Sequence, residues 1–232
     1  MTLDIRRAAD RFRTVDPGRE TWHAFSFGPH YDPANTGLGP LVLHDEHRLA
    51  ADAGFAPHPH AEVEVVTWVL RGALRHEDST GRSGVVRPGS VQVMSAGTGV
   101  VHEERADGVP TDVVQAWVLP DGPPGPPSYA QADVGEALSR GGLVAVASGR
   151  PEDGAPLALR HAGTALHAAR LAAGDAVVLA AGPRWHVFTA RGEVDADGTR
   201  LAAGDAVRVT GAALRLTAAE DAELLVWELP AD

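Results

Sequence analysis

Two short pairs of potential metal ligands stand in the first half of the chain. His58 and His60 form an H-x-H pair, and His102 and Glu104 form an H-x-E pair. Side chains two residues apart in a strand project from the same face, about 6.6–7 Å apart along the chain, so each pair can converge on one ion. Three imidazoles and one carboxylate suit Fe, Mn, Ni, Cu or Zn better than Ca or Mg. The two spacings predict a transition-metal site, provided that the two strands are neighbours.

Glu64 is a further carboxylate close to the first pair. If one strand runs unbroken from His58 through Leu70, Glu64 points to the same side as the histidines. It then either accepts a hydrogen bond that orients a ligand histidine, which is the interpretation we favour, or binds the ion directly. Glu103, inside the second pair, is expected on the opposite face as a surface charge.

Three other histidines of the first half stand beside groups that could support such a site. His76 precedes two acidic residues at a predicted hairpin, where a solvated turn is the expected role. His23 and His30 flank two phenylalanines, and they either line the mouth of a pocket or are structural residues with satisfied nitrogens. The second half has three histidines but no H-x-H or H-x-E pair, so no equivalent ligand set is expected there.

The composition excludes several other kinds of site. The chain has no cysteine, which rules out disulfides, zinc–thiolate and iron–sulfur centres and cysteine nucleophiles. Its 20 basic and 31 acidic residues give a formal net charge of −11, which argues against nucleic acid or an anionic membrane as a partner. Neither a Gly-rich phosphate loop between a strand and a helix nor a G-x-S-x-G elbow is present. No apolar run approaches the ~20 residues of a membrane helix, and charges occupy the place of a signal peptide's apolar stretch, so we expect a cytoplasmic protein.

Turn residues divide the chain into many short segments. With 26 glycines and 17 prolines among 232 residues, the sequence favours short strands joined by tight turns and predicts an all-β protein. The best helix candidate is residues 129–140. The heptapeptide LAAGDAV at residues 171–177 returns at 201–207, which indicates a reused β-turn or equivalent hairpins in similar barrels. The predicted strands are residues 63–70, 90–94, 112–119, 143–147, 176–179, 185–189 and 224–229.

A proline-rich segment separates two halves of similar length. Five prolines within residues 120–127 predict a stiff connector that cannot lie in a central strand. Each half has the right size for a β-sandwich or barrel, so we expect a metal-binding unit of this kind over residues 1–120, a linker over 121–127, and a second sandwich or barrel over 128–232. The second barrel is expected to be degenerate and without metal, with Trp185 and Trp227 in packing contacts.

The motifs around the predicted ligands resemble those of the pirin family of bicupins. The resemblance covers residues 22 to about 119, whereas the second half resembles the family in length and strand pattern. The motifs are WHAFSFG at 22–28, Tyr31-Asp-Pro33, FAPHPH at 55–60, Glu64, TWVLRG at 67–72, HED at 76–78, Pro88-Gly89, MSAGTGVVH at 94–102 and Glu104.

This resemblance implies two cupin-type jelly-roll β-barrels packed together, with few short helices. It implies that His58, His60, His102 and Glu104 bind one divalent ion, usually Fe²⁺, with Ni, Cu, Mn, Co or Zn as alternatives. Some family members are quercetin 2,3-dioxygenases, so it also implies a dioxygenase that takes a flavonol-like substrate and O₂, with Glu104 as the possible base. The alternatives are an iron- or redox-sensing regulator that binds a protein partner, or an isomerase on the same scaffold. The sequence indicates neither the substrate-binding residues nor the natural substrate.

Overall fold

Strands form almost all of the regular structure of this chain. The computed structural model describes residues 3–231 and places 22 strands in that range. The helices of the same range are the single turn α1 (Gly135–Leu138) and the 3-10 turns η1 (Ala8–Asp10) and η2 (Pro151–Asp153). The prediction of an all-β protein with few short helices is therefore confirmed. Within residues 3–231, no helix has the length and hydropathy needed to cross a membrane.

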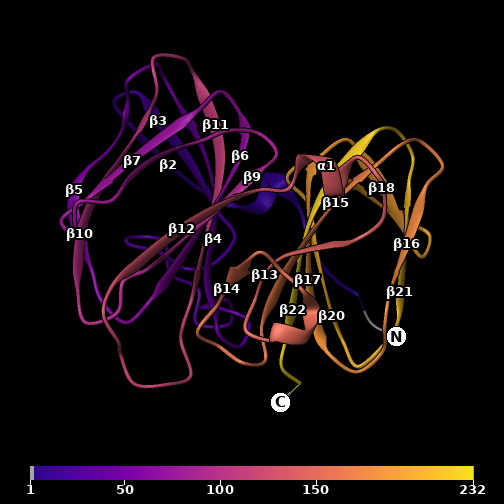
Figure 1. Ribbon diagram of the computed structural model, residues 1–232. Helices are drawn as coiled ribbons and strands as arrows, with labels where there is room; N and C mark the ends of the chain where they lie inside the picture. The colour runs from indigo at the N-terminus through magenta and orange to yellow at the C-terminus, as the bar shows by residue number, and fades with distance from the viewer. Residues whose placement is uncertain (1–2, 232) are drawn as a thin grey trace. The chain divides into compact units, whose positions relative to one another are not determined.

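The strands belong to two compact units, each built from antiparallel sheets (Figure 1). The N-terminal unit holds residues 12–134 and 157–162, and the C-terminal unit holds residues 3–11, 135–156 and 163–231. Each unit contains one large and one small sheet, the two-sheet arrangement of a jelly-roll barrel.

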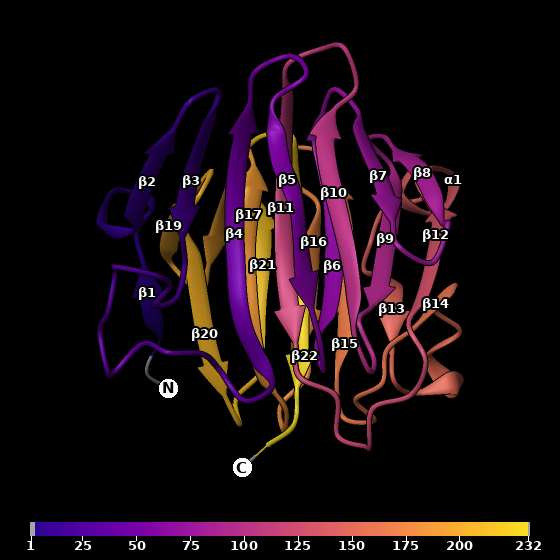
Figure 2. The same cartoon turned by 90° about the vertical axis from the view of Figure 1, so that its left-hand side faces the viewer.

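The N-terminal unit carries the predicted ligands on its small sheet. Figure 2 looks onto this sheet, in which β5 (Gly54–His60), β10 (Val100–Ala106), β7 (Leu74–Asp78) and β8 (Ser83–Val86) lie side by side in that order. The large sheet has the order β12 (Ser128–Asp133), β9 (Ser90–Ser95), β6 (Glu64–Arg71), β11 (Thr111–Val118), β4 (Leu41–Leu49), β3 (Arg19–His23) and β2 (Phe12–Asp16). The short strand β14 (Leu157–Ala158) also belongs to this unit.

The C-terminal unit repeats the arrangement with a filled apolar interior. Its buried cluster includes Val187, Leu224 and Val226. The strands of its large sheet that belong to this unit have the order β1 (Asp4–Arg6), β20 (Ala206–Thr210), β17 (Arg184–Arg191), β22 (Ala222–Leu229), β15 (Ala165–Leu171) and β13 (Val144–Ser148). Its small sheet has the order β16 (Ala176–Leu179), β21 (Leu214–Ala218), β18 (Glu193–Ala196) and β19 (Thr199–Ala202).

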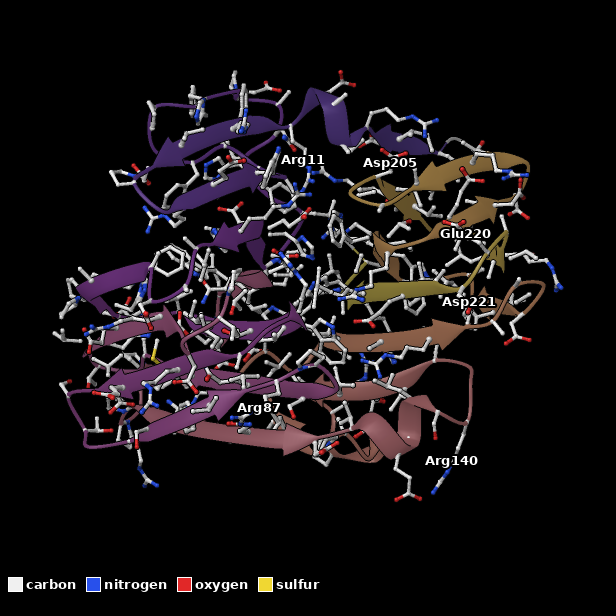
Figure 3. The ribbon with its side chains drawn as sticks, turned by 90° about the horizontal axis from the view of Figure 1, so that it is seen from above. Arg11, Arg87, Arg140, Asp205, Glu220 and Asp221 are labelled. Atoms are coloured by element: carbon white, nitrogen blue, oxygen red, sulfur yellow. The ribbon has the colours of Figure 1, made fainter. Side chains whose placement is uncertain are left out.

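The boundaries of these units differ from the predicted domains of residues 1–120 and 128–232. The first strand, β1, pairs with β20 and so belongs to the C-terminal unit. Asp205, labelled in Figure 3, holds the following segment by accepting hydrogen bonds from Arg7 Nη1 (2.7 Å) and the Ala8 amide (2.8 Å). Past the proline-rich segment, β12 pairs with β9 of the N-terminal unit. The residues of such a terminal strand do not indicate its partner, because the partner strand lies far away in the sequence.

The helix predicted for residues 129–140 is mostly wrong. Residues 128–133 form strand β12, and only the single turn α1 follows. The alternation of Tyr129 and Gln131 with small residues suits a strand on a sheet edge, and sheet pairing outweighs the helical propensity of the alanines.

The repeated heptapeptide forms the same β-turn twice. The amide of Asp175 donates to Ala172 O, and that of Asp205 donates to Ala202 O, both at 2.9 Å. Gly174 and Gly204 have φ of 91° and 86°, the left-handed conformation that a type II turn requires at this position. The interpretation as a reused turn that begins a new strand is therefore confirmed.

The interior of the N-terminal unit has a polar layer between two apolar clusters. One cluster contains Val69 and Leu74, and the other contains Val65 and Met94. Strand β6 passes through all three layers, because Val65, Thr67 and Val69 project from one face. The polar layer includes a row of residues paired from strand to strand across the large sheet, which we call the polar row: Gln92, Thr67, Gln115, Asp45 and His23.

Candidate metal centre

Strands β5 and β10 bring the two predicted ligand pairs together. They are antiparallel neighbours, and His102 lies directly opposite His58. Between His102 and Glu104 the register shifts, because β5 has one extra residue there. This bulge bends β5 next to the histidines, as bulges often do beside functional sites.

The imidazoles of His58, His60 and His102 form one compact group. The ring centroids lie 4.8 Å apart for His58 and His60, 4.5 Å for His58 and His102, and 5.0 Å for His60 and His102. One nitrogen from each of the three rings lies within 4.8 Å of the others. The prediction that the H-x-H pair meets His102 thus agrees with the geometry of the structure.

The nitrogens of this group suit a transition ion. His58 Nδ1 donates to the Ala56 carbonyl at 2.8 Å, which leaves Nε2 as the nitrogen that can bind an ion. That Nε2 lies 3.1 Å from Nε2 of His102. Two nitrogens that each lie about 2.1 Å from one ion, at angles of about 90–110°, are about 3.0–3.4 Å apart. The observed separation therefore fits two ligands of one ion.

The protonation states of the group also favour a cation. Burial lowers the pKa of His60 to about 4, and the neighbouring His58 acts in the same direction. Burial likewise lowers the pKa of His102 to about 4, although Glu104 opposes this shift. Both rings are therefore neutral at pH 7, which is the form that binds metal.

Glu104 is a buried carboxylate held by two amides of the polar row. Gln92 Nε2 donates to its Oε1 at 3.1 Å, and Gln115 Nε2 donates to its Oε2. Burial alone would raise the pKa of Glu104, but His76, His102 and Gln115 outweigh it and lower the pKa to about 2. Glu104 is therefore ionised at neutral pH, and its negative charge lies beside the histidine group.

Glu104 belongs to a second group of potential ligands that adjoins the first. This group contains His76, His102 and Glu104, so His102 is shared by both groups. Within residues 3–231, these two are the groups of three or more potential ligands, and both lie in the N-terminal unit. His167, in the C-terminal unit, instead lies 3.1 Å from Glu228.

The predicted solvated turn at His76 is wrong. His76 is fully buried, with its Nδ1 3.7 Å from Glu104 Oε1 and its Nε2 3.3 Å from Asp78 Oδ2. Burial lowers the pKa of His76, but these two carboxylates outweigh it and raise the pKa. The physical reason is strand alternation: β7 continues to Asp78, so His76 and Asp78 both point inward.

Glu64 has a different environment from the predicted one. The chain turns at Glu62, where φ is 56°, and β6 then enters the large sheet, so the parity of β5 does not continue to Glu64. Glu64 Oε2 accepts a hydrogen bond from the Arg160 amide at 2.5 Å, and burial raises its pKa. This carboxylate holds the segment 157–162 and does not orient a ligand histidine. Glu103 pairs with Arg105 at 2.6 Å on the outer face, where it was expected.

A cavity of about 250 Å³ opens beside the three histidines. His58, His60 and His102 line one part of it, and both aromatic and polar side chains line the rest. Trp117 packs edge-on against His60 (4.9 Å between centroids), and Phe27 packs edge-on against Trp117 (5.7 Å). The cavity is small, mostly apolar and adjacent to the ligands, which suits a flat aromatic molecule.

His23 also lines this cavity, in agreement with one of the two interpretations of its sequence context. His30 contacts the same wall through Thr14 Oγ1, at 3.2 Å. Sequence reasoning missed Gln92, Gln115 and Tyr129. Tyr129 stacks on His76 at 4.6 Å and donates to Gln92 Oε1 at 3.1 Å, which fixes the direction of that amide.

Comparisons with known proteins agree with the fold and with the family that the motifs resemble. Residues 5–118 match the family model described as Pirin, and residues 145–229 match that described as Quercetinase C-terminal cupin domain. A Mycobacterium tuberculosis protein named "Putative quercetin 2,3-dioxygenase" is 48% identical over 99% of this chain and 96% of its own. The Escherichia coli K12 protein named quercetin 2,3-dioxygenase is 30% identical over 97% and 98%.

A solved structure extends this similarity to three dimensions. The crystal structure of the bacterial pirin YhhW from Escherichia coli in complex with nickel(II) superposes with a TM-score of 0.91. It is 29% identical and covers all of both chains. The prediction of two cupin barrels is confirmed by these matches.

Proposed function

Because this chain belongs to the pirin family of bicupins, we propose that it is a metal-dependent dioxygenase that cleaves a flavonol such as quercetin with O₂. The ion would be held by His58, His60, His102 and Glu104. The observation that carries this proposal is the 3.1 Å approach of His58 Nε2 and His102 Nε2 at the wall of an aromatic cavity.

The ligand set gives the bound ion a low net charge. Three neutral imidazoles and one carboxylate on a divalent ion leave a charge of about +1, because only Glu104 contributes a negative charge. When bound, the ion would supply an open, Lewis-acidic position for the substrate oxygen and for O₂. Fe²⁺ is the ion that we propose, and Ni²⁺ is supported by the nickel complex of the similar bacterial pirin.

The residues of the chain would prepare the substrate mainly by holding it. The rings of Phe27, Phe55 and Trp117 line the cavity and can hold a flat flavonol while excluding bulk water. Glu104 can accept the hydroxyl proton only if its carboxylate gives up part of its present contacts, because a base with a pKa of about 2 is poorly matched to neutral pH. The contacts that hold Glu104 therefore favour a role as ligand over a role as base.

The cavity also favours an enzyme over the alternative of a regulatory protein. A redox sensor needs only a surface that changes with the state of the ion, whereas an enzyme needs room for a substrate beside the ion. The cavity beside His58, His60 and His102 offers such room and supports the enzyme.

The proposal is tested by oxygen consumption. Metal-free protein is loaded anaerobically with Fe²⁺, Ni²⁺, Mn²⁺, Co²⁺, Cu²⁺ or Zn²⁺, mixed with quercetin, and exposed to O₂ at an oxygen electrode. We expect one O₂ consumed per quercetin with at least one ion, and background consumption in the metal-free protein and in His60→Asn. Background consumption with every ion would refute the proposal.

A further inference from the structure

A chain of hydrogen-bonding groups lines the cavity where β2, β3 and β4 meet. His23 Nδ1 lies 2.7 Å from Asp45 Oδ2, and both residues are buried. His23 Nε2 lies 2.9 Å from Thr14 Oγ1, which is in turn 3.2 Å from His30 Nε2. Thr14, His23 and Asp45 all line the cavity that the metal-binding histidines line.

The carboxylate of Asp45 sets the direction of this chain. An ionised carboxylate only accepts, so His23 Nδ1 carries a hydrogen, and the tautomer whose one ring hydrogen is at Nδ1 has its lone pair at Nε2. The hydroxyl of Thr14 then donates to His23 Nε2 and accepts from His30 Nε2–H. A hydroxyl oxygen has two lone pairs, so Thr14 keeps one with which it can accept a hydrogen bond from a ligand in the cavity.

This acceptor lies well away from the candidate metal centre. In the register of the large sheet, His23 of β3 lies opposite Asp45 of β4, and Asp45 lies opposite Gln115 of β11. The side-chain amide of Gln115 holds Glu104. Two steps between strands separate the backbones of His23 and Gln115 by about 10 Å. Aromatic rings cover the interval, because Phe27 stacks on His23 at 5.6 Å and also contacts Trp117. A ligand that reaches both ends must therefore be elongated, flat and polar at its far end.

We propose that Thr14 Oγ1 accepts a hydrogen bond from a phenolic hydroxyl on the part of the substrate farthest from the metal. This inference rests on the proposed dioxygenase function and names a further substrate-binding residue for it. His23 and Asp45 act through Thr14 as positioning residues, because they hold its own hydrogen away from the ligand. A chain that ends on a carboxylate also strengthens each of its hydrogen bonds.

The test compares two flavonols in the metal-loaded protein without oxygen. Quercetin carries hydroxyls on both outer rings, whereas 3-hydroxyflavone keeps only the hydroxyl next to the carbonyl. Binding is measured by calorimetry for the wild type, Thr14→Val, Thr14→Ser and the control Thr199→Val, a half-buried threonine of the C-terminal unit. We expect Thr14→Val to weaken quercetin binding about 10-fold and to leave 3-hydroxyflavone unchanged, since one buried hydrogen bond is lost. Thr14→Ser should restore quercetin binding.

Asp45→Asn tests the positioning role. The side-chain amide can donate to His23 Nδ1, which moves the ring hydrogen to Nε2 and makes Thr14 accept from His23. The Thr14 hydroxyl is then free to donate, so the preference for quercetin over its outer-ring methyl ethers should shrink about 10-fold. A structural role alone would weaken all of these ligands equally.

Three results would overturn the inference, and they differ in what they leave standing. If the wild type binds no flavonol with any ion, the proposed function and this inference both fail. If Thr14→Val keeps the preference of the wild type for quercetin, the function stands and the role of Thr14 fails. If Asp45→Asn keeps the wild-type discrimination against methyl ethers, the positioning role of His23 and Asp45 fails.

Discussion

Gln115→Leu removes one of the two amides that hold Glu104 in its charged form. The Gln115 amide donates to Glu104 Oε2, and both side chains are buried. A hydrogen bond to a charged group contributes about 1.5–3 kcal/mol, and one pKa unit corresponds to about 1.4 kcal/mol. The substitution should therefore raise the pKa of Glu104 from about 2 by about one to two units.

The same loss should weaken metal binding. Removing a partner that supports a ligand typically lowers metal affinity about 10- to 100-fold. We expect this loss for Ni²⁺ or Fe²⁺ at pH 7, measured by competition with a chromophoric chelator. Gln131→Leu is the matched control, because Gln131 is exposed on β12 and donates to the Val85 carbonyl at 3.0 Å.

The metal-free protein provides a second readout of the same change. The pKa of Glu104 is lower in the folded state than its ordinary value of 4.5, so this group stabilises the fold above pH 4.5 and loses that contribution as the pH falls towards 2. In Gln115→Leu the contribution is smaller and disappears at a higher pH, which urea unfolding between pH 2 and 7 would show. Equal metal affinity in the Gln115 and Gln131 variants, with the same pH profile, would refute the reasoning.

Three further predictions concern protonation, packing and turns. Since burial lowers the pKa of His60 and His102 to about 4, proton competition at these two ligands should lower metal affinity only near and below pH 4, as a pH series of chelator competitions would show. Gly54→Ala would place a Cβ 2.0 Å from a carbonyl oxygen of β10, so it should separate β5 from β10 and lower both metal content and thermal midpoint. Asp205→Ala leaves the amide of Ala8 without its acceptor and should cost about 2–4 kcal/mol in urea unfolding. The equivalent Asp175→Ala removes one exposed contact and should cost less than about 1 kcal/mol; equal costs would contradict the argument.

The two candidate ligand pairs could be found in the sequence because their spacing depends on a local period. Residues two apart share a face in any strand, so His58 with His60, and His102 with Glu104, needed no knowledge of the sheet order. The same rule places His76 and Asp78 on one face, and both point inward. The turn residues that follow them led instead to the prediction that His76 is exposed to solvent.

Other parts of the site depend on information that is not local. Gln92 and Gln115 look like polar interruptions of apolar strands until the sheet order places both against Glu104. For Glu64, a local rule was applied too far along the chain. Glu62 has a positive φ, and the chain turns there into another sheet, so Glu64 does not share a face with His58 and His60. The pairing of β1 with β20 has the same origin, since nothing near residues 4–6 specifies a partner two hundred positions away.

The polar row has a consequence for how this barrel can go wrong while folding. Each of its members comes from a different strand, and a slip of one position in β9, β6, β11 or β3 replaces the polar side chain with an apolar neighbour. A slip in β11, for example, would put Val114 or Ala116 where Gln115 belongs. Such a misaligned barrel could still collapse around its two apolar clusters, but it would lose the hydrogen bonds that hold Glu104. Metal binding after refolding would therefore show that the strands are correctly aligned. The fraction of refolded molecules that binds no metal would measure how often the alignment fails.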